Sequence, residues 1–132
     1  MRGAALLLLA LSLAACAETP PPSWQPPIGP NPVFDQAPEA AAGSRLIVTD
    51  LRLGPDAVGL THYHPWEEFL YVIEGSALLE MDGAPPRTLL AGERFVIPAQ
   101  VVHTPRAGPQ GMRGIVVRVH REGDPVSVPV VR

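Results

Sequence analysis

The chain has 132 residues, which is enough for one domain rather than two, and its apolar fraction of 46% is sufficient for a packed core. A formal charge of −3 argues against nucleic acid as a partner. The single cysteine excludes an internal disulfide.

Residues 1–15 predict a secretion signal. One arginine precedes residues 4–15, which are apolar except for Ser12. A helix of this length spans roughly 18 Å, well short of the roughly 30 Å hydrocarbon core of a bilayer, so a membrane span is not expected. The ending LAAC resembles the lipobox of bacterial lipoproteins, which implies that Cys16 is lipidated and becomes the mature N-terminus. An ordinary cleaved signal with a chance cysteine is the alternative.

Residues 16–43 are expected to form the lipidated cysteine and a disordered, proline-rich linker. Residues 17–43 hold eight of the seventeen prolines, and proline lacks the N–H that helices and central strands need. Trp24 and Phe34 either dock on the domain or are incidental in the linker. Ala17 after the cysteine resembles a non-retained lipoprotein, which implies a lipid anchor on the periplasmic side of the cell envelope, with the outer membrane favoured.

Residues 44–132 predict an all-β domain. Short apolar runs rich in β-branched residues are separated by turn residues, and none shows ten residues of clean helical periodicity. Seven to nine such strands indicate a sandwich or barrel. Because a domain of about 89 residues buries only a modest share of its surface, a homodimer is expected.

Three histidines and an acid predict a metal site. His62 and His64 are two residues apart, so on a strand both side chains leave the same face. Glu67 and Glu68 follow, and His103 comes after a second apolar run. Three imidazoles and one carboxylate suit a divalent transition metal such as Fe, Mn, Ni, Cu or Zn. Four protein ligands leave positions of an octahedral ion open, which catalysis requires.

The spacing of the first two histidines resembles the first conserved motif of the cupin superfamily. That motif reads Gly, five residues, His-x-His, three or four residues, Glu, six residues, Gly. The matching residues are His62, His64, Glu68 and Gly75. Asp56 stands in the place of the opening glycine.

The region around His103 resembles the second cupin motif, Gly, five residues, Pro-x-Gly, two residues, His, three residues, Asn. Gly92, Pro98 and His103 are in register. Gln100 replaces the second glycine and Ala107 replaces the asparagine. These departures affect turns rather than metal ligands.

The resemblance covers about residues 45–121 and implies a single cupin jelly-roll barrel. It implies that one metal ion is held by His62, His64, Glu68 and His103. Glu67 is then a solvated surface acid. A cupin without metal, in which the histidines are simply polar residues, is the alternative.

Other polar and aromatic residues are expected to have structural roles. His120 is predicted at the surface or at a strand end. Arginines in strands usually face water, and an inward one would indicate a carboxylate-bearing substrate; the candidates are Arg94, Arg113 and Arg118. The larger side chains that either wall the interior or pack in the core are Trp66, Phe69, Tyr71, Met81 and Phe95.

Two functions are compatible with this sequence. The resemblance implies a metal-dependent, oxygenase-type enzyme similar to quercetin dioxygenase-like cupins, acting on a small organic substrate. In such an enzyme Glu68 would hold the metal and could also accept a proton as a catalytic residue. The alternative is a non-catalytic lipoprotein module that binds a metal or a small ligand. The same fold supports several chemistries, so the fold alone does not choose between them.

Overall fold

A computed structural model describes residues 24–131, in which eight strands pair in antiparallel fashion. The strands are β1 (Gly29–Gln36), β2 (Ser44–Leu53), β3 (His62–Tyr63), β4 (Glu68–Met81), β5 (Arg87–Leu90), β6 (Arg94–Ile97), β7 (His103–Arg121) and β8 (Val128–Pro129). The predicted signal peptide and the lipidation site at Cys16 lie outside the described residues. Within residues 24–131, no helix has the length and apolar character needed to cross a membrane.

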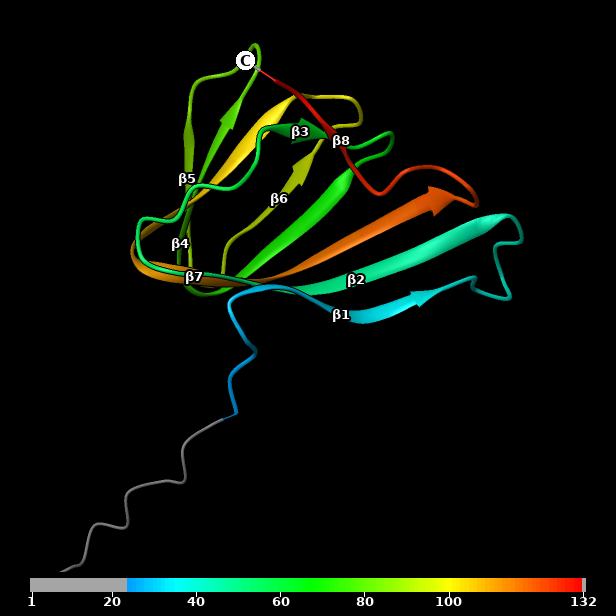
Figure 1. Ribbon diagram of the computed structural model, residues 1–132, viewed down its shortest axis with the longest axis horizontal. Coiled ribbons are helices and arrows are strands. Elements are labelled where there is room, and N and C mark those ends of the chain that lie inside the picture. Colours follow the sequence, from blue (N-terminus) through cyan, green and yellow to red (C-terminus); the bar gives the residue numbers. More distant parts are fainter. Residues whose placement is uncertain (1–23, 132) are drawn as a thin grey trace, which may run out of the picture.

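The strands form one sheet that is strongly curled (Figure 1). The strand order along the main path is β1-β2-β7-β3-β8, and β4 pairs with β5, β6 and β7. Figure 1 shows β1 and β2 along one side of the molecule, with β3, β5 and β6 on the other. The prediction of an all-β jelly-roll barrel is confirmed.

The pairing between the two longest strands, β4 and β7, is irregular near Gly75. Their pairing shifts between Val72 and Glu74 and again between Gly75 and Ala77. Gly75 has a φ of 68°, and a Cβ atom added there would overlap the carbonyl oxygen of Gly111. Only glycine fits such a close approach of two backbones. The glycine that ends the first motif therefore serves the sheet rather than the chemistry.

Two departures from the cupin motifs fall at left-handed backbone positions. Asp56 has a φ of 54° and Gln100 a φ of 62°, and they are the two non-glycine residues with positive φ in the described part of the chain. Glycine adopts this conformation without strain, whereas other residues do so at a cost. The turns expected from the motifs are thus retained although the glycines are not.

Strict alternation along β4 directs its side chains. Glu68, Leu70 and Val72 are buried, whereas Phe69 and Tyr71 are 40% and 49% exposed. The expectation that these two aromatic rings wall the interior or pack in the core is therefore wrong, because they occupy the outward positions of the strand. The buried core is instead mainly aliphatic; it comprises Leu70, Val72, Ala77, Leu79, Leu89, Ile97, Ala107, Met112 and Val116.

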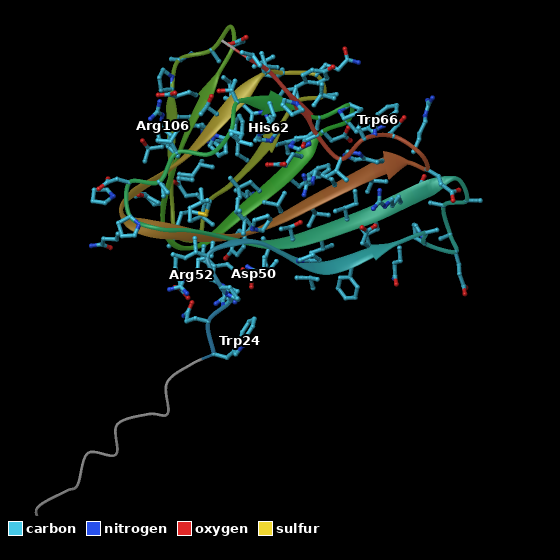
Figure 2. All side chains as sticks on the ribbon, viewed as in Figure 1. Trp24, Asp50, Arg52, His62, Trp66 and Arg106 are labelled. Atoms are coloured by element: carbon cyan, nitrogen blue, oxygen red, sulfur yellow. The ribbon has the colours of Figure 1, made fainter. Side chains whose placement is uncertain are left out.

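Strand β1 lies within the segment that the sequence analysis assigns to the linker. Its residues pair with β2 from Gly29↔Arg52 to Gln36↔Leu46, with an irregularity between Pro32 and Phe34. A proline-rich strand is tolerated here because β1 is an edge strand, where one row of N–H groups has no partner strand. Trp24 and Phe34 are 73% and 51% exposed, and Figure 2 shows Trp24 clear of the sheet.

Candidate metal centre

Strands β3 and β7 bring the predicted histidines together. His62 pairs with His103 across β3 and β7, and His64 follows β3 directly. The ring centroid of His62 lies 4.4 Å from that of His103 and 4.7 Å from that of His64. One nitrogen of each ring lies within 4.8 Å of the corresponding nitrogens of the other two. Three nitrogens that lie this close together could hold a single ion.

Backbone carbonyls fix the orientation of all three imidazoles. The Nδ1 atoms of His62 and His103 lie 2.7 Å and 3.0 Å from the carbonyl oxygens of Leu60 and Val101. His64 Nδ1 contacts the carbonyl oxygen of Val126 in the same way. A carbonyl only accepts hydrogen bonds, so each Nδ1 carries the proton and donates it. Because Nδ1 is the donor to the carbonyl, Nε2 is the atom that each ring presents to a metal, as in metal-binding histidines.

The Nε2 atoms of the three rings fit a cation. The Nε2 atoms of His62 and His64 are 3.0 Å apart, and two lone pairs at that distance repel unless a proton or a metal ion lies between them. Burial lowers the pKa of His62 and that of His103, because the charged imidazolium loses hydration. Both rings are therefore neutral near pH 7 and able to coordinate. The donor set fits a divalent transition metal.

Glu68, the fourth predicted ligand, lies beside His64. Its Oε2 atom is 2.8 Å from His64 Nε2 and 3.8 Å from Arg118 Nη1. Burial alone would raise the pKa of Glu68, but the hydrogen bond from His64 and the nearby positive charges outweigh it and lower the pKa. The carboxylate is thus ionised and close to the nitrogen that would bind a metal. Glu67, as predicted, is exposed.

Arg118 is buried, although strand arginines were expected to face water, and His120 is buried one residue before the end of β7, at a strand end rather than at the surface. Both lie on the inward-facing positions of β7, together with Met112 and Val116. Arg118 Nη2 donates to Thr49 Oγ1 at 3.1 Å. His120 Nδ1 donates to the carbonyl oxygen of Pro125 at 3.1 Å. Of the other two candidate arginines, Arg94 is exposed and Arg113 forms ion pairs with Asp50 and Glu74.

Residues 124–126, which follow β7, hold two histidines and Trp66 through hydrogen bonds. Val126 holds His64, and the adjacent Pro125 holds His120. Trp66 Nε1 donates to Asp124 at 2.7 Å, and the Arg121 guanidinium lies 4.8 Å from the Trp66 ring. Trp66 therefore holds this segment in place and does not line the pocket.

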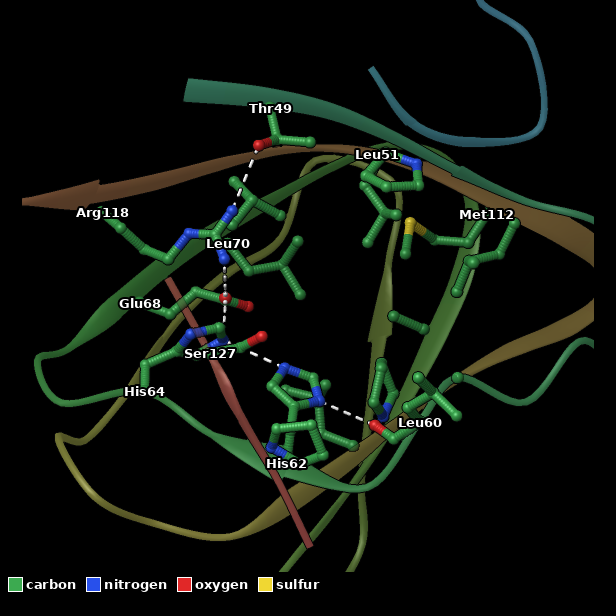
Figure 3. Close-up of a pocket in the computed structure, with 18 residues that line it drawn as sticks. Thr49, Leu51, Leu60, His62, His64, Glu68, Leu70, Met112, Arg118 and Ser127 are labelled. Atoms are coloured by element: carbon green, nitrogen blue, oxygen red, sulfur yellow. Dashed lines mark hydrogen bonds and ion pairs between the residues drawn. The ribbon is translucent and has the colours of Figure 1, made fainter. Parts of the chain in front are cut away.

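The metal centre borders a pocket of about 330 Å³ (Figure 3). Figure 3 shows Arg118, Glu68, His64 and His62 along one side, with Leu51, Met112 and Leu60 on the other. The pocket is within the size range of small-molecule sites. Its walls are apolar but not aromatic. The larger apolar side chains that line it are Leu51, Leu53, Leu60, Leu70, Leu79, Met112 and Val116.

Comparison with known proteins agrees with this architecture. Residues 50–118, just over half of the chain, match the family described as Cupin domain. The 3-hydroxyanthranilate 3,4-dioxygenase of Jannaschia sp. (strain CCS1) is 31% identical over 100 residues, which cover 74% of this chain and 51% of that enzyme. The chain therefore spans about half the length of this curated relative.

Solved structures show the same fold at low sequence identity. A Klebsiella pneumoniae protein with a double-stranded β-helix domain has a TM-score of 0.58 at 20% identity, over 78% of this chain and 86% of its own. A cupin-like protein from Thermotoga maritima has a TM-score of 0.59 at 20% identity, over 76% and 74%. DMSP lyase DddQ from Ruegeria pomeroyi has a TM-score of 0.57 at 21% identity, over 74% and 50%.

Proposed function

The chain belongs to the cupin family, and on that premise we propose that it is a metal-dependent, dioxygenase-like enzyme that acts on a small organic substrate. The observation that carries this proposal is the convergence of three imidazoles whose Nδ1 atoms are held by carbonyls, two of which, His62 and His64, line one side of an apolar pocket. A redox-active metal bound there would supply Lewis acidity and electron transfer between an organic substrate and dioxygen.

The residues of the chain would bind and orient both metal and substrate. His62, His64 and His103 would hold the metal through Nε2, with Glu68 as the fourth ligand beside His64. The aliphatic wall would exclude water and pack against the apolar part of a substrate. An ionised Glu68 is also placed to accept a proton from a substrate hydroxyl or C–H group, provided that the group binds within hydrogen-bonding distance.

The pocket favours an enzyme over the alternative of a non-catalytic binding module. A purely structural metal site is closed by its ligands and by packed side chains. Here His62, His64 and Glu68 border a cavity of about 330 Å³ with aliphatic walls, which leaves room for a reacting molecule.

We further propose that this enzyme works at the cell envelope. The support is the sequence of residues 1–16, which resembles a lipoprotein signal with Cys16 as the lipidated residue. A protein exported before folding would load its metal outside the cytoplasm, where zinc and copper compete well against iron and manganese. Membrane attachment through Cys16 and homodimerisation are parts of the same proposal.

Two measurements test the proposal. Elemental analysis of the purified protein is expected to find about one divalent transition metal per chain, and a metal-free result would contradict the site. Oxygen consumption is then measured with phenolics, thiols and diketones after loading with Fe²⁺, Mn²⁺, Ni²⁺ or Cu²⁺, with His103→Ala as the control. Uptake that requires both metal and His103 supports the enzyme; absence of uptake with every metal favours the binding module.

A further inference from the structure

The guanidinium of Arg118 has far more hydrogen-bonding capacity than the protein uses. The side chain is about nine-tenths buried, and a guanidinium offers five N–H donors. The described contacts are one hydrogen bond, from Nη2 to Thr49 Oγ1, and an ion pair with Glu68 at 3.8 Å, beyond hydrogen-bonding distance. No group among residues 24–131 hydrogen-bonds to the buried Nε atom. A buried cation with unused donors is costly, so its presence calls for a ligand.

Arg118 and Thr49 both line the pocket that contains the metal centre. Figure 3 shows the terminal nitrogens of Arg118 reaching toward Thr49 and Glu68, on the same side of the pocket as His64. Thr49 Oγ1 accepts from Arg118 and keeps its own O–H free to donate. A planar carboxylate matches this combination, because a guanidinium fork and a hydroxyl are all donors.

The charges of the site also favour an anion. Among the described residues that line the pocket, Glu68 and Arg118 are the charged side chains apart from the histidines. A divalent metal on neutral imidazoles would add two positive charges to the one on Arg118, against the single negative charge of Glu68. The buried site would then carry an excess of two positive charges, which an anionic ligand reduces.

We propose that Arg118 and Thr49 form an anion subsite for the carboxylate of a small apolar acid. The apolar body of this acid packs against the leucines on the opposite wall, and its remaining functional group faces the three histidines. The inference rests on the proposed function, since it names the substrate class of the same pocket. Aliphatic walls, one oxyanion subsite and one metal centre together define a substrate with an apolar middle and two polar ends.

The test compares acids with their neutral amides. Isothermal titration measures the Kd of benzoate against benzamide and of isobutyrate against isobutyramide, on the full chain with and without one equivalent of Zn²⁺. The acids are expected to bind about tenfold or more tightly than the amides, because hydrogen bonds to charged groups exceed neutral ones. Arg118→Met should abolish this preference and Arg118→Lys should keep part of it. Arg94→Met, which removes an exposed arginine outside the pocket, should leave the preference unchanged.

A milder variant protects the test against misfolding. Thr49→Val is nearly isosteric and is expected to reduce the preference for acids about two- to fivefold while leaving the Zn²⁺ content unchanged. Equal Kd values for acid and amide in the parent protein, or a preference that survives in Arg118→Met, would overturn the subsite. If the preference is present without Zn²⁺ and the protein binds no metal, the subsite stands while the proposed metal-dependent function fails. If the protein binds metal but shows no preference for acids, the subsite fails while the proposed metal-dependent function stands.

Discussion

The two polar parts of the pocket are built in different ways. His62 and His64 stand on or beside β3, which has only two residues, and His103 is the first residue of β7. The three rings are held by carbonyl groups outside the strands, those of Leu60, Val101 and Val126. Arg118 instead lies inside the long ladder of β7, where it pairs with Ile47 of β2 and with Glu68 of β4. A side chain flanked by two long strands is positioned by the fold itself. Carbonyl groups of loops orient the histidine rings, so a bound metal would add order to that part of the pocket.

The largest expected effect comes from removing one of the three histidines. His103→Ala should weaken Zn²⁺ binding by more than the roughly 10- to 100-fold that loss of an outer hydrogen bond costs, because a ligand itself is lost. Competition with a chromophoric chelator measures the Kd. The matched control is His120→Asn, whose amide can still donate to Pro125; it should change the Kd only a few fold. A comparable loss in both variants would mean that His120 also binds the metal.

Replacing Arg118 should lower the stability of the fold more than it lowers the affinity for a metal ion. Arg118→Met leaves the Glu68 carboxylate buried beside a methionine, and breaking a buried ion pair of this kind costs about 3 kcal/mol. Urea unfolding of the metal-free protein measures the free energy of unfolding. Arg94→Met, at an exposed position, should change it by no more than about 0.5 kcal/mol. Equal stability of the two variants would show that the 3.8 Å pair contributes little.

Acid should weaken the histidine part of the site selectively. Burial lowers the pKa of His62 and that of His103 below their ordinary value of 6.5. Because the unfolded chain then binds protons more readily than the folded one, stability is full above pH 6.5 and is lost as the pH falls through the lowered values. Thermal unfolding of the metal-free protein between pH 8 and pH 5 should show a flat Tm followed by a decline. A Tm that rises on acidification would contradict this sign. Zn²⁺ affinity should decline over the same range, since protons compete for Nε2.

The smallest effect is expected at a strained turn. Gln100 has a φ of 62°, and its backbone N–H donates to the carbonyl oxygen of His64 at 2.8 Å. Gln100→Gly relieves the left-handed strain but makes the unfolded chain more flexible, so a net gain of at most about 1 kcal/mol in unfolding free energy is expected. Gln100→Val is the counterpart and should destabilise the protein, because a β-branched residue tolerates positive φ poorly. A loss of stability in Gln100→Gly would show that the turn is not strained.

The three-histidine cluster was predictable from the sequence because the spacing of two motifs carries it. The spacing of His62 and His64 predicts one shared strand face, and the motif resemblance adds His103 and the choice of Glu68 over Glu67. The jelly-roll fold follows from the same resemblance and from the short β-branched runs. The structure brings the three histidines to within ligand distance of one another.

The other polar part was missed because the parity of β7 is ambiguous in the sequence. The run from Gly114 to His120 contains apolar residues on both faces, so alternation alone does not show that Arg118 and His120 point inward. The register with β4, where Arg118 pairs with Glu68, resolves it. In β4 the signal was present: once Glu68 is assigned inward, Phe69 and Tyr71 must face outward. Proline content alone likewise gave no sign of β1, whose pairing with β2 is a long-range contact.

The short strand β8 links the metal centre to the last residues of the chain. Val128 and Pro129 pair with Tyr63 and His62, and the Val130 N–H donates to the carbonyl oxygen of Thr61 at 3.0 Å. An affinity tag fused directly after this strand, or an exopeptidase that trims it, would therefore disturb the backbone that carries His62. Loss of metal in a C-terminally tagged preparation would then report on the tag rather than on the native protein.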